Sequence, residues 1–88
     1  MKILYDSQKH TIRKLEPNSY ERKLNRLENE ILKYMANNKY LNLLELKQLT
    51  DVDTYEQIHF NLRRLKGRLT IEHKKYMGYR LEDDIWII

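Results

Sequence analysis

The sequence contains no cysteine, and only two glycines and one proline among its 88 residues. The absence of cysteine excludes disulfide bonds, thiolate metal sites and cysteine nucleophiles. With 41% apolar and 34% charged residues, the composition is typical of an ordered globular protein rather than a disordered or fibrous one. The sequence therefore predicts a chain that folds on its own in a reducing compartment.

Long apolar runs are also lacking, and the segment 85–88 is among the longest stretches of consecutive apolar residues. A membrane-spanning helix needs about 20 such residues, and a signal peptide needs an apolar core of about 7 to 15. We therefore expect no membrane partner and a cytoplasmic location.

Positive charge is unevenly distributed along the chain, whose net charge is +4 at pH 7. Residues 56–80 contain seven Lys or Arg against two Asp or Glu, whereas residues 81–88 contain three acidic residues and no basic one. A dense run of cations in one segment is what neutralisation of nucleic-acid phosphates requires. The charge pattern therefore favours a nucleic-acid partner for residues 56–80.

The first 24 residues have the pattern of short strands. Apolar and polar residues alternate in 2–6 and 11–15, and the turn-rich residues between them predict a hairpin. Pro17 fixes its own φ and disfavours helix before it, so a turn is expected there. The segment 20–24 is interpreted as a third strand, with a helix over 19–24 as the alternative.

Three helix starts follow, each with a capping residue and a Glu or Gln three positions later. The pairs are Asn25 with Glu28, Asn42 with Glu45, and Thr54 with Gln57. Apolar residues at helical spacing come after each pair, and the third segment is expected to run over 54–69. Its apolar residues recur at offsets of four, three and four, which places them on one narrow face toward the core: Ile58, Leu62, Leu65 and Leu69.

The last segment returns to a strand pattern. Residues 70–73 and 79–81 predict a second hairpin, with Gly78 in its turn because glycine readily adopts positive φ. The acidic residues 82–84 are expected to form a solvated turn. The segment 85–88 is interpreted as a further strand or as a packed apolar tail.

This order predicts an α+β fold of the winged helix-turn-helix type. It would comprise a small N-terminal antiparallel sheet (1–24), a three-helix core (25–69), and a C-terminal β-hairpin wing with a tail (70–88). Eighty-eight residues are the length of one small domain. We therefore expect a single domain over 1–88.

The side of the third helix opposite its apolar face is the candidate recognition surface. Its polar, cationic and aromatic residues are Gln57, Phe60, Asn61, Arg63, Arg64 and Arg68. In the major groove, amides match adenine edges, guanidiniums match guanine edges or phosphates, and an aromatic ring can contact a thymine methyl. Such a face can also carry cations for solubility alone. The basic turn Lys74-Lys75, next to Tyr76, favours the DNA interpretation because it can reach nearby phosphates.

Three segments resemble the OmpR/PhoB-type winged-helix effector domains of bacterial two-component systems. Residues 24–32 are similar to the start of that family's first helix. Residues 58–66, which end in Arg-Arg-Leu-Lys, resemble its recognition helix, and Gly-Tyr-Arg-Leu at 78–81 resembles the end of its wing. The chain differs from the family at Glu56, His59 and Tyr76.

The resemblance implies sequence-specific binding of double-stranded DNA by a transcriptional regulator without cofactors. It implies base or phosphate contacts from Gln57, Phe60, Asn61 and Arg64, phosphate contacts from Arg63 and Lys66, and a wing contact from Lys75. RNA polymerase or another transcription protein is a compatible further partner, and a monomer or weak homodimer is expected on DNA. We expect no receiver domain, so control would come from expression level, a partner or dimerisation.

Two other function classes are considered. An enzyme is not expected, because His10, His59 and His73 lie on different expected elements without metal-ligand spacing and no glycine-rich phosphate loop is present. The alternative is a winged-helix protein-interaction module, an adaptor or inhibitor of a transcription protein. Seven tyrosines, Phe60 and the apolar segment 85–88 would suit such an interface.

Overall fold

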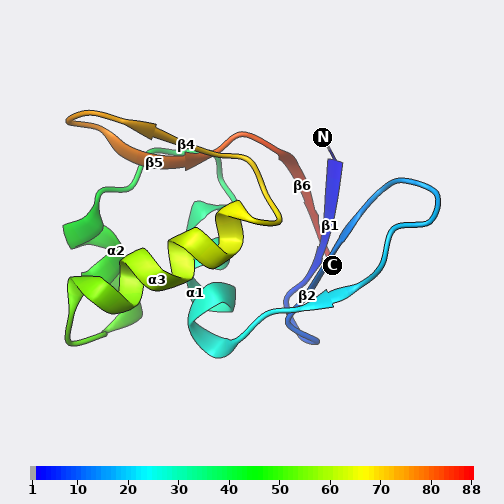
Figure 1. Cartoon of the computed structure of the whole chain (residues 1–88), viewed down its shortest axis with the longest axis horizontal. Coiled ribbons are helices and arrows are strands. Elements are labelled where there is room, and N and C mark those ends of the chain that lie inside the picture. Colours follow the sequence, from blue (N-terminus) through cyan, green and yellow to red (C-terminus); the bar gives the residue numbers. More distant parts are fainter. Residues whose placement is uncertain (1) are drawn as a thin grey trace.

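The computed structural model describes residues 2–88; Met1, the first residue of the expected strand region 1–24, lies outside them. Within these residues the chain forms three helices and two sheets, which confirms the predicted α+β class (Figure 1). In chain order the elements are β1 (Lys2–Asp6), β2 (Thr11–Lys14), β3 (Arg22–Lys23), α1 (Arg26–Met35), α2 (Leu43–Thr50), α3 (Tyr55–Lys66), β4 (Ile71–Lys74), β5 (Gly78–Leu81) and β6 (Asp84–Ile87). No helix in residues 2–88 has the length and apolar character that crossing a membrane requires.

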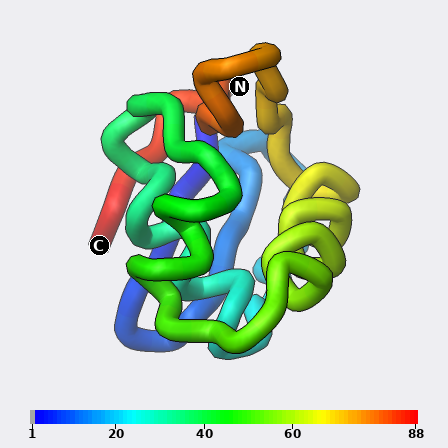
Figure 2. The backbone as a smooth tube through the Cα atoms, turned by 90° about the vertical axis from the view of Figure 1, so that its left-hand side faces the viewer, coloured from blue at the N-terminus to red at the C-terminus, as the bar shows by residue number. Residues whose placement is uncertain are grey.

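The larger sheet joins both ends of the described chain. Its strand order is β3-β2-β1-β6, with β1–β2 and β2–β3 antiparallel and β6 parallel to β1. Figure 2 shows β6, in red, beside the dark blue β1. The prediction of a purely antiparallel N-terminal sheet is therefore wrong. Pairing with β6 satisfies the second edge of β1, and Ile85 packs against the core at the same time.

All three helices begin as the capping patterns predict. Asn25, Asn42 and Thr54 each accept a hydrogen bond from the third helical residue, whose side chain bonds back to the cap. The end of α3 differs from the expectation of a helix over 54–69, because α3 ends at Lys66 with Gly67 as its cap. Arg68 and Leu69 therefore follow the helix rather than extend it.

The core lies between the helices and the inner face of the larger sheet. Ile58, Leu62, Leu65 and Leu69 are all buried, which confirms the inward face predicted for the third helix. The other members of this core come from both sheets and from α1 and α2: Ile3, Tyr5, Ile12, Leu24, Ile31, Leu32, Met35, Leu46, Tyr79 and Leu81. Burial of this set orients α3 and exposes its opposite side.

The second sheet consists of β4 and β5 and connects α3 to β6 (Figure 1). Tyr79 N donates to Leu41 O at 2.8 Å, and Leu41 N donates to Tyr79 O at 2.9 Å, so the loop before α2 pairs with β5. Gly78 has the positive φ that the sequence predicts, at 107°. Tyr76, in the β4–β5 turn, also has a positive φ of 68°, which is uncommon for a bulky residue.

The acidic segment after β5 is not the solvated turn that its composition predicts. Asp83 is buried, and its Oδ2 accepts a hydrogen bond from Thr70 N at 2.7 Å. Asn38 Nδ2, just after α1, donates to Leu81 O at 2.6 Å. These two side chains satisfy backbone groups where the chain turns from β5 into β6, so they fix the route of β6 into the sheet.

Candidate nucleic-acid interface

The exposed face of α3 carries four of the predicted site residues: Gln57, Phe60, Arg63 and Arg64. The Phe60 side chain is 53% exposed, and the Arg64 guanidinium lies over its ring, 5.8 Å from the centroid. Gln57 Oε1 accepts a hydrogen bond from Thr54 N at 3.3 Å as part of the capping box. This box leaves the two N–H groups of the Gln57 amide available to an acceptor outside the chain.

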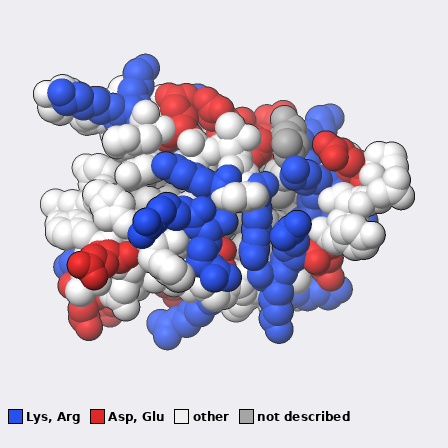
Figure 3. Space-filling model, in the orientation of Figure 1, with Lys and Arg blue, Asp and Glu red and all other residues white. Residues whose placement is uncertain are grey.

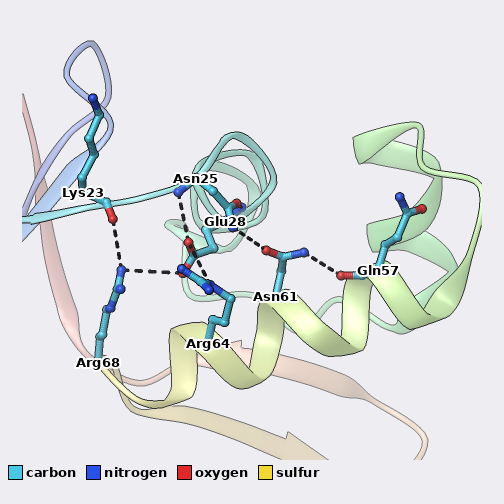
Figure 4. Close-up of polar contacts among 7 residues, drawn as sticks. All are labelled: Lys23, Asn25, Glu28, Gln57, Asn61, Arg64 and Arg68. Atoms are coloured by element: carbon cyan, nitrogen blue, oxygen red, sulfur yellow. Dashed lines mark hydrogen bonds and ion pairs between the residues drawn. The ribbon is translucent and has the colours of Figure 1, made fainter.

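Asn61 does not belong to this exposed face, so its predicted contact with a DNA base is wrong. Only 6% of the residue is exposed. Its Oδ1 accepts a hydrogen bond from Asn25 Nδ2 at 2.9 Å, and its Nδ2 donates to Gln57 O at 2.8 Å (Figure 4). The start of α1 covers this position of α3, and the amide joins the two helices instead of facing outward.

A buried carboxylate lies beneath the C-terminal half of α3. Glu28 of α1 has no exposed surface, and its Oε1 accepts from Asn25 N at 3.0 Å and lies 3.4 Å from Arg64 Nε. Glu28 Oε2 lies 3.7 Å from Arg68 Nη1, which also donates to Lys23 O at 3.2 Å (Figure 4). The Arg64 and Arg68 side chains remain 44% and 22% exposed. Glu28 therefore orients both guanidiniums without covering them fully.

The remaining predicted site residues lie at the end of α3 and around the β4–β5 turn. Lys66, Lys74, Lys75 and Tyr76 are all exposed, Tyr76 to 93%. Lys66 Nζ lies 5.3 Å from the centre of the Tyr79 ring, and Lys75 Nζ lies 5.1 Å from that of Tyr76. The aromatic rings of the second sheet therefore accompany the cations near it.

Figure 3 shows how the cations lie on the face that α3 presents. Lys and Arg side chains form a band across the middle of this face, over α3 and the chain beside it, and a separate group lies over the tip of the β4–β5 pair. Arg22 and Lys23 of β3 are exposed and follow Arg68 in this direction. The sequence analysis did not include β3, although residues 1–23 already carry an excess of basic residues.

A polar cluster fastens the β4–β5 pair to the loop between α1 and α2. Glu72 of β4 accepts hydrogen bonds from the Tyr40 hydroxyl and from Arg80 Nη2, the latter at 3.0 Å. These two bonds, that of Tyr40 foremost, lower the pKa of Glu72 to about 2. The neighbouring Glu72 carboxylate raises the pKa of Glu82. The ionised form of Glu72 therefore holds the second sheet in place.

Acid is expected to loosen this cluster. The pKa of Glu72 is lower in the folded chain, at about 2, than its ordinary value of 4.5, so its contribution to stability is complete above pH 4.5 and disappears as the pH falls toward 2. Glu82 acts in the opposite sense, because its raised pKa removes stability as the pH rises. We expect Glu72→Gln to flatten the loss of melting temperature between pH 4.5 and pH 2, and Glu82→Gln to raise the melting temperature slightly at pH 7. Thermal unfolding by circular dichroism across this range tests both, and an unchanged slope in Glu72→Gln would contradict the assignment.

Comparison of the chain with models of protein families, with curated proteins and with solved structures gives no match. In residues 2–88, no three His, Asp or Glu side chains are grouped so that they could hold a metal ion. The surface with the most distinctive chemistry in these residues is the cationic and aromatic face of α3. Its geometry is the basis for a functional proposal.

Proposed function

We propose that the chain is a winged helix-turn-helix protein that binds double-stranded DNA and regulates transcription. In this proposal α2 and α3 form the helix-turn-helix, α3 enters the major groove, and the β4–β5 pair acts as the wing. The order of three helices followed by a two-stranded sheet supports this assignment. The likeness of segments 24–32, 58–66 and 78–81 to OmpR/PhoB-type domains supports it as well.

The observation that carries the proposal is the composition of the exposed side of α3. Its inner side is fixed by buried aliphatic residues, so Gln57, Phe60, Arg63 and Arg64 are presented together on a helix of 12 residues. An α-helix fits the major groove of B-DNA, which is about 12 Å wide. A free amide, an exposed ring and two guanidiniums supply both base-edge and phosphate contacts. With Asn61 occupied by α1, base readout falls to Gln57, Phe60 and Arg64.

The tip of the β4–β5 pair supplies the second contact in this proposal. Lys74 and Lys75 are exposed there beside Tyr76, whose left-handed backbone conformation is unfavourable for a tyrosine. Strained residues of this kind cluster at functional positions. Cations beside an exposed ring at the end of a hairpin suit the phosphates or the minor groove next to the site of α3.

Binding to duplex DNA should therefore depend steeply on salt. With about four phosphate contacts, log K should fall with log salt at a slope of about −3 to −4, which is roughly a 100-fold loss between about 50 mM and about 200 mM salt. Fluorescence anisotropy on a labelled random-sequence duplex measures this slope. Selection of bound duplexes from a random pool then identifies the preferred sequence.

Three substitutions separate the proposed roles. Arg64→Ala should weaken binding and relax preference at one base position, whereas Lys75→Ala should weaken binding to all sequences and reduce the salt slope by about 1. Lys33→Ala, which removes an exposed cation from α1, is the matched control for the change in net charge. Equal affinities for all three variants and the unsubstituted chain would refute the proposal.

A second candidate function, a protein-interaction module, is favoured by β6. This strand is at the edge of the larger sheet, and Trp86, Ile87 and Ile88 are 57%, 58% and 65% exposed. An exposed edge with apolar side chains can pair with a strand of another chain. Such binding would bury apolar area and depend little on salt, and Trp86, the single tryptophan, would report it by a blue shift of its fluorescence.

A further inference from the structure

A cavity of about 260 Å³ opens between the chain that joins β2 to β3 and the C-terminal end of α3. Four cationic residues line it, namely Arg13, Lys14, Arg22 and Arg68, against the single acidic residue Glu16. None of the expected site residues except Arg68 belongs to it. The cavity is therefore a separate cationic feature of the molecule.

The register of the larger sheet explains why cations gather here. Lys14 pairs with Ile3 and Arg22 pairs with Ile12, and directly opposed residues project from the same face of a sheet. Ile3 and Ile12 are buried in the core, so Lys14 and Arg22 lie on the helix side of the sheet, at its margin. Cations on a core-facing side usually have an anionic partner.

That partner is missing for most of these cations. Arg68 is held by Glu28 and by Lys23 O. In residues 2–88, Lys14 and Arg22 have no carboxylate oxygen within 4.0 Å. Ser19 Oγ, also at the cavity, accepts from Lys14 N at 3.1 Å, which leaves its hydroxyl hydrogen available to a bound oxyanion. The cavity thus combines unpaired cations with a hydroxyl donor.

We propose that this cavity binds a phosphate group. Lys14 and Arg22 donate charge-assisted hydrogen bonds to its oxygens, Ser19 adds a neutral one, and Arg68 is already oriented at the rim. In the DNA complex this group is a backbone phosphate of the duplex that α3 occupies, and that part of the inference rests on the proposed function. Arg64 and Arg68 share Glu28, so the cationic row of α3 continues into the cavity (Figure 4). The contact surface on DNA is then larger than a helix and a wing alone.

The test uses the double substitution Lys14→Ala/Arg22→Ala, with Lys33→Ala/Lys39→Ala as the control that removes the same charge from exposed positions elsewhere. At low salt the first variant should bind a random-sequence duplex about tenfold more weakly, with a salt slope smaller by about 2, whereas the control should change affinity by about twofold or less. Thermal unfolding establishes that both variants are folded. A third variant, Ser19→Ala, should weaken binding without changing the net charge.

Titration with inorganic phosphate, followed by the backbone amide resonances, distinguishes a free anion from a DNA phosphate. Shifts confined to residues 13–22 and 67–68, lost in Lys14→Ala/Arg22→Ala, support the site. If the duplex binds with the expected salt slope but the double substitution matches its control, the cavity inference is overturned and the proposed function stands. If no duplex binds but phosphate still shifts these resonances, the proposed function fails and the cavity is a site for a free phosphate group. Absence of both effects overturns both.

Discussion

Replacing Gly78 with alanine is expected to lower the free energy of unfolding by roughly 3 kcal/mol, enough to shift the melting temperature by more than about 10 °C. Gly78 has a φ of 107°, which L-residues rarely adopt. An added Cβ would lie 2.4 Å from Leu41 O and 2.7 Å from the Cα of Asn42. Both atoms belong to the backbone, so no side-chain rotation relieves the contact. The pairing of Leu41 with Tyr79 has to open instead.

Gly67 provides the matched control for this substitution. It has a φ of −69° in the right-handed region, and its added Cβ would meet Arg64 O at 3.4 Å, an ordinary contact distance. Gly67→Ala should therefore be neutral or stabilise the chain by up to about 1 kcal/mol, because alanine reduces the entropy of the unfolded state. Urea denaturation of the two variants measures the difference. Equal stabilities would show that the β5–Leu41 contact is looser than the structure describes.

Much of the helical part of this fold could be predicted from local sequence. Asn25, Asn42 and Thr54 begin the three helices because each satisfies backbone N–H groups within its own first turn. The inward face of α3 follows from the spacing of its aliphatic residues alone. Gly78 was also predictable, since a turn with positive φ favours glycine.

The features that escaped prediction depend on residues distant in sequence. Parallel pairing of β6 with β1 brings together segments about 80 residues apart, and no periodicity within either strand specifies it. Asp83 has the composition of a solvated turn but is buried because Thr70 N needs an acceptor. Helical geometry places Asn61 opposite the core, yet Asn25 of α1 covers it. Composition and period describe a helix by itself and do not show which neighbour lies against it.

Glu28 shows the same limit at the candidate site. Its capping role could be predicted, because it lies three residues after Asn25. Its second role as the counter-ion of two arginines on α3 could not, since it arises only when α1 and α3 pack together. The arrangement has a functional consequence, because a buried negative charge beneath the cationic face weakens the potential that this face presents to DNA.

Glu28→Gln is accordingly expected to change stability and DNA affinity in opposite directions. The glutamine keeps an oxygen for Asn25 N but removes the charge that compensates Arg64 and Arg68. Because both guanidiniums keep access to solvent, the loss should be roughly 2 kcal/mol, less than that for a fully buried pair. The same change removes the competitor for the two guanidiniums, so affinity for duplex DNA at low salt should rise about three- to tenfold.

Glu30→Gln is the control that separates this effect from a change in net charge. Glu30 pairs with Arg26 one turn along α1, where the Arg26 side chain is 88% exposed, so its loss should lower stability by about 0.5 kcal/mol or less. Both variants gain one positive charge overall, and only Glu28→Gln releases the α3 arginines. The excess gain in affinity of Glu28→Gln over Glu30→Gln, measured by anisotropy at about 50 mM salt, isolates that release. Equal gains would mean that Arg64 and Arg68 do not contact DNA, and a loss of affinity in a folded Glu28→Gln would mean that DNA requires them in the orientation that Glu28 imposes.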